Sequence, residues 1–216
     1  MGQKIIVVGA GPGGLATALR LGGQGYDVEV FEAQSRVGGR MRGFEKEGYA
    51  FDTGPSILQM PQLYDDLFAS AGLDRHSYIP FTQLDLYTRL KFWDETQLDL
   101  TRDLNQLKTQ LKTLREDLPQ ALDNWIQEQK RLYEAGYEPY LSEPVRPILG
   151  YAKLNELATV LSFRPWESLY QHFWRNFKDD RLVYALSYPA KYLGMHPTLS
   201  TSVFSLIPYL EIAFGV

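Results

Sequence analysis

The feature that most constrains the fold of this 216-residue chain is a glycine-rich turn near its beginning. Gly9, Gly11 and Gly14 follow one apolar run, and Glu32 closes a second run, with a helical pattern of apolar residues between them. The first run is typical of a buried parallel strand, and the pattern after the turn is typical of an amphipathic helix. This order predicts a βαβ unit built from residues 4–8, from a helix carrying Leu15, Ala18 and Leu19, and from residues 28–31.

The residue types in this turn suit the binding of a dinucleotide. Gly9 permits the tight turn, Gly11 lets the backbone approach a pyrophosphate, and Gly14 lets the helix pack closely on the strand. The helix N-terminus favours an anion, and Glu32 can accept hydrogen bonds from ribose hydroxyls while repelling a 2′-phosphate. FAD or NAD is therefore favoured over NADP, and the alternative is a glycine-rich turn beside a solvated Glu32. The predicted cofactor-binding residues here are Gly9, Gly11, Pro12, Gly13, Gly14, Glu32 and Ala33.

A second motif follows the acid and points from NAD to FAD. Arg36, Gly38, Gly39 and Arg40 form an R-x-G-G-R segment, and residues 51–55 read Phe-Asp-Thr-Gly-Pro. Here the chain resembles the superfamily of flavin-dependent amine oxidases and phytoene desaturases, in which this loop passes close to the FAD phosphates. Paired glycines allow close backbone approach and Arg40 offers a rigid guanidinium to phosphate oxygens, whereas the alternative is a solvated basic loop. The resemblance adds Gly38, Gly39, Arg40, Gly54, Pro55 and Ser56 to the predicted cofactor site.

Later stretches of the chain resemble the bacterial-type carotenoid desaturases within that superfamily. This resemblance implies an FAD-dependent oxidoreductase that introduces double bonds into a carotenoid or isoprenoid hydrocarbon by hydride transfer to FAD. In such an enzyme the cofactor carries the chemistry and the protein aligns the bond, so no catalytic acid or base is assigned. The matching stretches are residues 48–56, 63–68, 133–137, 177–182, 193–197, 206–211 and 214–216.

The resemblance also sets the expected fold class and domains. It implies an α/β protein with a Rossmann-like FAD-binding βαβ unit and an inserted, largely helical substrate region, an incomplete glutathione-reductase-type FAD fold. Residues 1–83 are expected to be the N-terminal part of the FAD-binding domain, and residues 84–216 the N-terminal part of a substrate or membrane-facing region. Because relatives are much longer, we expect a missing C-terminal half as partner, weak FAD retention, and self-association through an uncovered apolar sheet.

Pattern and turn residues predict the remaining elements. Two strand pairs are expected, residues 41–45 with 49–52 and residues 84–92 with 97–101, and a helix over residues 61–71. Leucines at helical spacing predict helices near residues 104–114 and 118–126, and residues 136–150 are expected to be a loop or hinge. Large apolar residues in four later segments are typical of a helical core or of a hydrocarbon-binding wall, and these segments are residues 154–163, 166–177, 182–193 and 202–214.

Composition excludes several other functions. A net charge of −4 gives no basic surface for nucleic acid, and the absence of cysteine excludes thiolate chemistry. His76, His172 and His196 lie far apart in sequence, so no metal site is expected. The acidic pairs at residues 65–66 and 179–180 are interpreted as helix starts or caps.

Localisation follows from what the sequence lacks. No secretory signal is visible, which favours the cytoplasm, and the apolar stretch 203–216 is too short to span a membrane. Membrane contact is therefore expected to be peripheral, on the cytoplasmic face. Three alternatives remain: another carotenoid-modifying flavoenzyme such as an oxygenase, ketolase or isomerase, a non-catalytic isoprenoid-binding protein of the same fold, as in GDP-dissociation inhibitors, or an inactive fragment.

Overall fold

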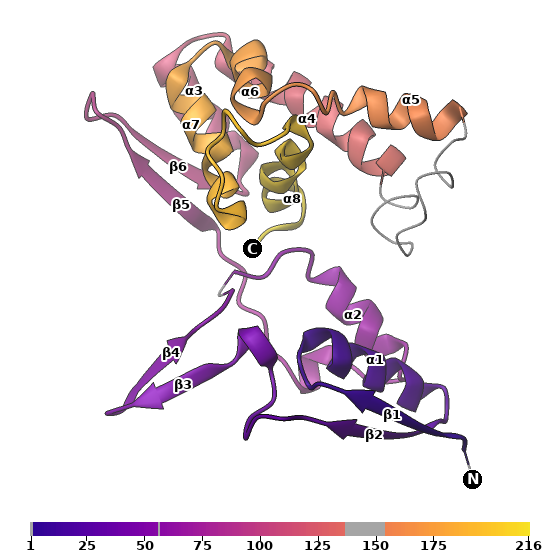
Figure 1. The fold of residues 1–216 in the computed structure, drawn as a ribbon. Coiled ribbons are helices and arrows are strands. Elements are labelled where there is room, and N and C mark those ends of the chain that lie inside the picture. Colours follow the sequence, from indigo (N-terminus) through magenta and orange to yellow (C-terminus); the bar gives the residue numbers. More distant parts are fainter. Residues whose placement is uncertain (1, 56, 137–153) are drawn as a thin grey trace. The chain divides into compact units, whose positions relative to one another are not determined.

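The computed structural model describes residues 2–55, 57–136 and 154–216, and the chain divides into two compact units (Figure 1). The first unit comprises residues Met1–Gln83 with Val216, and the second comprises Leu84–Gly215. Each unit is described by itself below. Within the described residues, no helix combines the length and the apolar character that crossing a membrane would require.

The first unit begins with the βαβ arrangement that the glycine pattern predicts. Strand β1 (Lys4–Val8) pairs in parallel with β2 (Asp27–Phe31), with Lys4 opposite Asp27 and Val8 opposite Phe31. Helix α1 (Pro12–Gly23) connects the strands and packs on one face of the sheet (Figure 1). The helix begins at Pro12 because a proline at the first helical position lacks only an N–H that would have no intrahelical partner.

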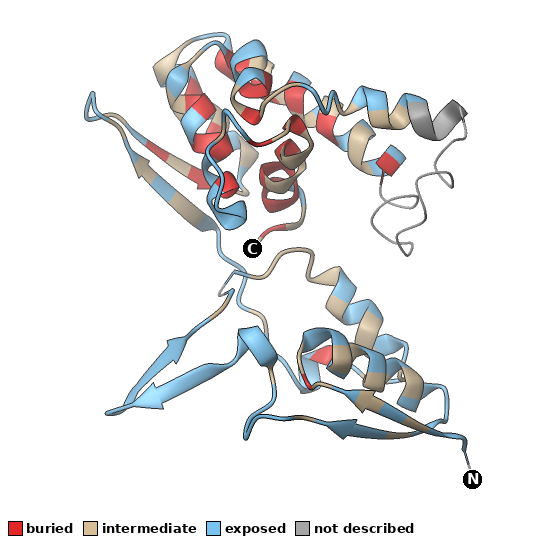
Figure 2. Ribbon diagram, in the orientation of Figure 1, coloured by how far each residue is buried: buried red, intermediate tan, exposed pale blue. Residues whose placement is uncertain are grey.

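The other face of this sheet is exposed, so the prediction of a buried strand is wrong for this face, and the expectation of an uncovered apolar sheet agrees with it (Figure 2). The exposed fractions are 58% for Ile6, 85% for Val8 and 55% for Phe31. Ile5 and Val7 point the other way and are half-buried, because successive side chains of a strand alternate between faces. Both faces of the sheet carry apolar residues. Among the described elements, α1 covers one face, and the other face has no helix packed on it.

The rest of the first unit is a hairpin and a short helix. A 3₁₀ turn occupies the start of the strand predicted over residues 41–45, so the first strand of the hairpin begins two residues later than expected. Glu47 and Gly48 form the hairpin turn, with positive φ angles of 55° and 81°. Arg75, almost fully buried, bonds to Asp65 in the helix and lies 4.0 Å from the centre of the Phe81 ring. The elements are η1 (Gly39–Met41), β3 (Gly43–Lys46), β4 (Tyr49–Asp52), α2 (Gln62–Ala69) and η2 (Arg75–Ser77).

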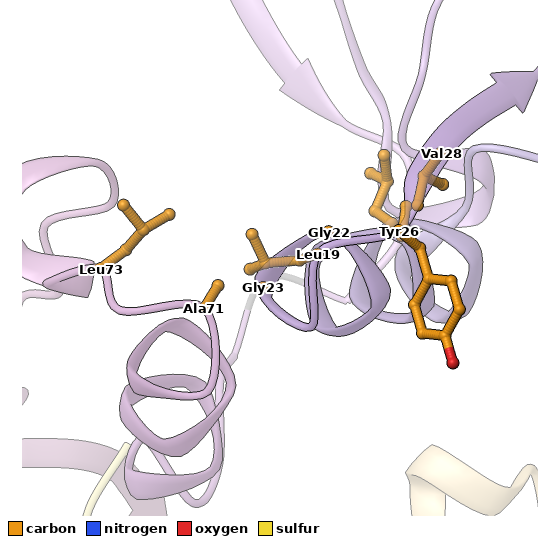
Figure 3. Close-up of a pocket in the computed structure, with 9 residues that line it drawn as sticks. Leu19, Gly22, Gly23, Tyr26, Val28, Ala71 and Leu73 are labelled. Atoms are coloured by element: carbon orange, nitrogen blue, oxygen red, sulfur yellow. The ribbon is translucent and has the colours of Figure 1, made fainter. Parts of the chain in front are cut away.

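The end of α1 meets the end of α2 around a shallow apolar hollow (Figure 3). Leu19 and Gly23 lie on the α1 side, and Ala71 and Leu73 lie on the segment after α2. A side chain at Gly23 would place its Cβ 2.5 Å from the Ala71 Cα, so the two helices can approach this closely only with glycine there. The hollow runs along α1 from Leu15 to Gly23, and none of the glycines of the glycine-rich turn lines it.

The second unit contains the main hydrophobic core. An antiparallel pair, β5 with β6, precedes helices whose buried faces carry Trp125, Phe173 and Phe177, each with essentially no exposed surface. Figure 2 shows the buried residues concentrated in these helices. The elements are β5 (Leu86–Lys91), β6 (Gln97–Thr101), α3 (Leu104–Leu114), α4 (Leu118–Gly136), α5 (Leu154–Ser162), α6 (Leu169–Phe177), α7 (Asp180–Ser187), η5 (Tyr188–Leu193), η6 (Ser202–Ser205) and α8 (Leu206–Phe214).

Local chemistry explains where several of these helices begin and end. Ser168 and Gln171 form a reciprocal capping box at the start of α6, and Asp179 accepts a hydrogen bond from the Arg181 N–H at the start of α7. The interpretation of Asp179 as a cap is thus confirmed. Helix α7 gives way to η5 at Pro189, which cannot donate a backbone hydrogen bond. The loop predicted over residues 136–150 lies outside the described residues except for Gly136, which ends α4.

Candidate dinucleotide-binding site

The turn between β1 and α1 consists of Gly9, Ala10 and Gly11, so its only side chain is the methyl group of Ala10. Gly9 has a φ of +96°, a conformation that favours glycine, and its N–H donates to the Phe31 carbonyl oxygen at 2.7 Å. Gly14 lies against the same turn, because a Cβ built on it would be 1.9 Å from the Gly9 carbonyl oxygen. Two of the three predicted glycines are therefore required by geometry within the protein itself.

The N-terminus of α1 is open. Gly11 is the N-cap without a side chain to cap the helix, and the first turn carries no acidic residue. A Cβ on Gly13 would meet no protein atom within 4 Å, and one on Gly11 would meet only the Gly39 Cα, at 3.9 Å. The N–H groups of Gly13 and Gly14 lie in the first turn, where an α-helix provides no intrahelical acceptor, so they are available to an anion.

Glu32 fastens the turn to the end of β2. One carboxylate oxygen accepts from the Ala10 N–H at 2.7 Å, and the other accepts from the Gln34 N–H at 2.8 Å. These two bonds, first that from Gln34, lower the pKa of Glu32, and the nearby Arg42 guanidinium lowers it further. The carboxylate is therefore ionised at neutral pH and retains lone pairs for further donors. Ala33 is exposed beside it, and its backbone N–H contributes to the same lowering.

The R-x-G-G-R segment packs directly on the glycine-rich turn. The Gly38 N–H donates to the Ala10 carbonyl oxygen at 2.8 Å, and a Cβ on Gly39 would lie 3.1 Å from the Gly11 Cα. Both glycines have positive φ angles, 105° and 56°. Arg40 is exposed and forms no ion pair with any residue that the structure describes, so its guanidinium is available to a ligand.

The segment after β4 joins the same cluster through Gly54. A Cβ on Gly54 would be 2.0 Å from the Arg40 carbonyl oxygen, and the neighbouring Thr53 hydroxyl donates to the Arg42 carbonyl oxygen. Pro55 is exposed, and the predicted residue Ser56 lies outside the described residues. Three sequence motifs therefore meet in one place: the glycine-rich turn, the R-x-G-G-R segment and the Thr-Gly-Pro segment.

Two residues of this cluster were not predicted from the sequence. Ala10 is 1% exposed and links both motifs, because its N–H bonds to Glu32 and its carbonyl oxygen accepts from Gly38. Arg42 lies in a hollow of about 400 Å³ with Arg36 and acts electrostatically on Glu32. The signal for Ala10 was its place between the first two glycines, and the signal for Arg42 was a third arginine directly after the motif.

In the second unit, buried polar side chains form hydrogen bonds with one another. The Trp125 indole N–H donates to the His172 Nε2 at 3.1 Å, and the Ser205 hydroxyl donates to the Gln129 side-chain oxygen at 2.8 Å. Burial, and then the Arg175 charge, lower the pKa of His172 to about 4, so the ring is neutral at pH 7. Among the described residues, no group of three His, Asp or Glu side chains converges as a metal site would require.

Comparison with known proteins agrees with the fold and with the resemblance that the motifs carry. A family described as "NAD(P)-binding Rossmann-like domain" matches residues 7–71. The all-trans-zeta-carotene desaturase of Myxococcus xanthus is 44% identical over 99% of this chain. This chain is similar to the N-terminal part of carotenoid desaturases. The 4,4′-diapophytoene desaturase of Staphylococcus aureus (strain Newman) is 31% identical over the same share of the chain.

The comparisons also locate the limits of the similarity. The chain spans 41% of the length of the Myxococcus relative and 43% of that of the Staphylococcus relative. Among solved structures, putrescine oxidase bound to putrescine matches 96% of this chain with a TM-score of 0.57 at 19% identity. An oxidoreductase from Methanosarcina mazei matches 99% with a TM-score of 0.52 at 18% identity. These structures confirm the predicted mixed α/β, Rossmann-like fold.

Proposed function

We propose that this chain binds FAD and contributes to an FAD-dependent carotenoid desaturase, which introduces double bonds into a polyene precursor. The observation that carries the proposal is the convergence of the three motifs around an uncapped helix N-terminus. The 44% identity to a zeta-carotene desaturase supports the choice of reaction and substrate class. Residues 1–83 would serve the cofactor and residues 84–216 would form part of the substrate region.

The residues at the site fit an adenine dinucleotide. The helix start at Gly11, Pro12, Gly13 and Gly14 would hold the pyrophosphate through its backbone N–H groups, and Glu32 would accept from the ribose hydroxyls with its remaining lone pairs. Arg40 would reach a phosphate, with Gly38 and Gly39 giving it room. The ionised state of Glu32 disfavours a ligand with a 2′-phosphate, which supports FAD or NAD over NADP.

FAD, when bound, supplies the hydride acceptor for the desaturation of a carbon–carbon single bond. The described residues of this chain bind and orient. Glu32 fixes the turn through the Ala10 and Gln34 N–H groups, and the turn in turn fixes the start of α1. Gly14 sets the distance between α1 and β1. Removal of two hydrogens from a carbon–carbon single bond also releases a proton, and no described side chain is assigned as the base that takes it.

A second polypeptide segment is part of this proposal. The relatives are more than twice as long as the matched region, and the sheet face with Ile6, Val8 and Phe31 is exposed. An apolar sheet face normally packs against another layer. We propose that further polypeptide covers this face in the working enzyme, that the enzyme is cytoplasmic, and that it meets its hydrocarbon substrate at a membrane.

A non-catalytic isoprenoid-binding protein and other carotenoid-modifying flavoenzymes are the competing functions. The experiment is to incubate the chain with FAD, NAD or NADP, remove excess ligand by gel filtration, and record the absorption spectrum. We expect a weakly retained flavin band and no retention of NADP. Vesicles containing phytoene are then added, and rising visible absorption reports new conjugated double bonds.

The outcomes separate the alternatives. Flavin binding with polyene desaturation supports the desaturase. Flavin binding with an oxygenated or isomerised polyene would favour another flavoenzyme, and retention of polyene without flavin would favour a carrier. Arg40→Ala is the site variant, and Arg20→Ala, at the far end of α1, is its matched control; equal flavin retention by both would contradict the assigned role of Arg40.

A further inference from the structure

The second unit carries two neighbouring groups of exposed aromatic side chains. We call the aromatic stripe the five exposed residues Trp93, Tyr184, Tyr188, Lys191 and Tyr192. The Trp93 ring meets the Tyr184 ring edge-on, with centroids 6.0 Å apart at an interplanar angle of 87°. The Lys191 Nζ lies 3.5 Å from the centre of the Tyr188 ring and 5.2 Å from that of Tyr192. The stripe therefore joins the β5–β6 turn to α7 and η5.

The stripe is additional to the core. Helix α7 already has a buried face, which consists of Leu182, Val183, Ala185 and Leu186. Tyr184 and Tyr188, four positions apart, lie outside this face, and Figure 2 shows the chain following α7 as largely exposed. Since packing within the unit does not account for these rings, the stripe is an unpartnered apolar surface.

The chemistry of the stripe fits the boundary between lipid and water. Each ring combines an apolar body with a polar N–H or hydroxyl group, which is the character of residues enriched at membrane interfaces. Leu193 and Met195 add exposed apolar side chains directly after it. Exposing these apolar side chains to water is unfavourable in free energy, and a partner that covers them would remove that cost.

Lys191 is the cation of the stripe that can meet an anionic headgroup. Lys191 forms no ion pair with any described residue, so its ammonium group remains available. Asp94, next to Trp93, is paired at 3.3 Å with Arg181, which also pairs with Asp179 at 2.9 Å. Burial, and then the Glu211 carboxylate, raise the pKa of Tyr192, so the stripe lies near charges of both signs, and Lys191 is the group that matches a phosphate at a bilayer surface.

We infer that the aromatic stripe docks this chain on a lipid bilayer that contains anionic phospholipid. The choice of a bilayer as the occupant rests in part on the proposed function, because a hydrocarbon substrate is held in lipid. The rings enter the interfacial layer and Lys191 pairs with headgroup phosphate.

Vesicle co-sedimentation tests the stripe. The purified chain is mixed with vesicles of phosphatidylcholine alone or of equal parts phosphatidylcholine and phosphatidylglycerol. Replacing Trp93 and Tyr188 together by serine should weaken binding about tenfold or more, since two interfacial rings are lost. Trp166→Ser is the matched control, because Trp166 has the same 68% exposure as Trp93 but no ring contact with the stripe. Lys191→Gln should weaken binding about fivefold, and only on the anionic vesicles.

Several results would overturn the inference. They are the absence of vesicle binding, equal losses for the stripe variant and the Trp166→Ser control, or a stripe variant that changes self-association without changing vesicle binding. Far-UV circular dichroism confirms folding of each variant. FAD retention is measured separately and without vesicles, and the stripe variants should retain FAD like the parent chain. Absence of vesicle binding by the parent chain with intact FAD retention refutes the docking surface alone, and absence of FAD retention with intact vesicle binding refutes the cofactor proposal alone.

Discussion

Substitution of Gly14 by alanine is expected to disrupt the βαβ unit, whereas the same change one residue earlier is expected to be tolerated. A Cβ on Gly14 would lie 1.9 Å from the Gly9 carbonyl oxygen and 3.1 Å from the Gly9 carbonyl carbon. A carbon–oxygen contact needs about 3.3 Å, so α1 must move by about 1.4 Å away from the turn. On Gly13 the added methyl group meets nothing within 4 Å.

The magnitudes follow from these distances. Alanine gains roughly 0.5–1 kcal/mol over glycine within a helix, and Gly13→Ala should approach this gain. Overpacking costs typically 1–3 kcal/mol, and here the obstacle is backbone, which cannot change rotamer. Gly14→Ala should therefore destabilise the first unit by about 2 kcal/mol net of the helix gain.

Amide hydrogen exchange provides the assay. All four tryptophans lie in the second unit, so tryptophan fluorescence during urea unfolding serves as an internal control that neither variant should change. Exchange of the β1 and β2 amides reports the first unit, and it should accelerate in Gly14→Ala and slow slightly in Gly13→Ala. Equal protection in the two variants, measured without cofactor, would refute the close packing of α1 on the turn.

Three further predictions concern the described contacts. The pKa of Glu32 is lowered, so its hydrogen bonds to the Ala10 and Gln34 amides should be fully formed above the ordinary pKa of 4.5 and should be lost as the pH falls through the lower pKa of the folded state. Hydrogen-exchange rates of these two amides should follow this pH dependence, and Glu32→Gln should weaken their protection at neutral pH. Burial lowers the pKa of His172 from its ordinary 6.5 to about 4, so the unfolded chain binds a proton at this residue before the folded chain does. The free energy of unfolding should therefore fall by up to about 3 kcal/mol between pH 6.5 and 4. Urea unfolding followed by tryptophan fluorescence should show this pH dependence in the parent chain and not in His172→Gln. Val8→Lys should reduce self-association of the chain, because Val8 is 85% exposed on an apolar sheet face, and unchanged sedimentation velocity would contradict this.

The sequence predicted those parts of the site that depend on local backbone chemistry. Gly9 must be glycine because of its positive φ angle, and Gly14 because of its close contact with the backbone of Gly9. Such local requirements place glycines at a fixed spacing, which can be recognised in the sequence. The contact between Gly39 and Gly11 could be predicted only through family resemblance, because the two residues belong to different motifs.

The sequence could not predict which apolar residues are buried. In residues 166–177 and 182–193 the pattern allowed either a core or a hydrocarbon-binding wall. The structure divides them: Phe173 and Phe177 are buried, whereas Trp174, Tyr184 and Tyr188 are exposed. The bond between Trp125 and His172 joins residues 47 positions apart and depends on helix packing. The exposed face of β1 depends on what lies beside the sheet, and strand pattern carries no information about that.

The proposed function requires that the start of α1 bind the pyrophosphate of an adenine dinucleotide. Amide chemical shifts of the isotope-labelled chain, recorded during titration with FAD and with ADP, test it most directly. Both ligands should shift the Gly13 and Gly14 amides, because both carry the diphosphate, and NADP should shift them less because Glu32 repels its 2′-phosphate. Shifts confined to residues outside 9–14 and 32–40, or no shift with either ligand, would contradict it.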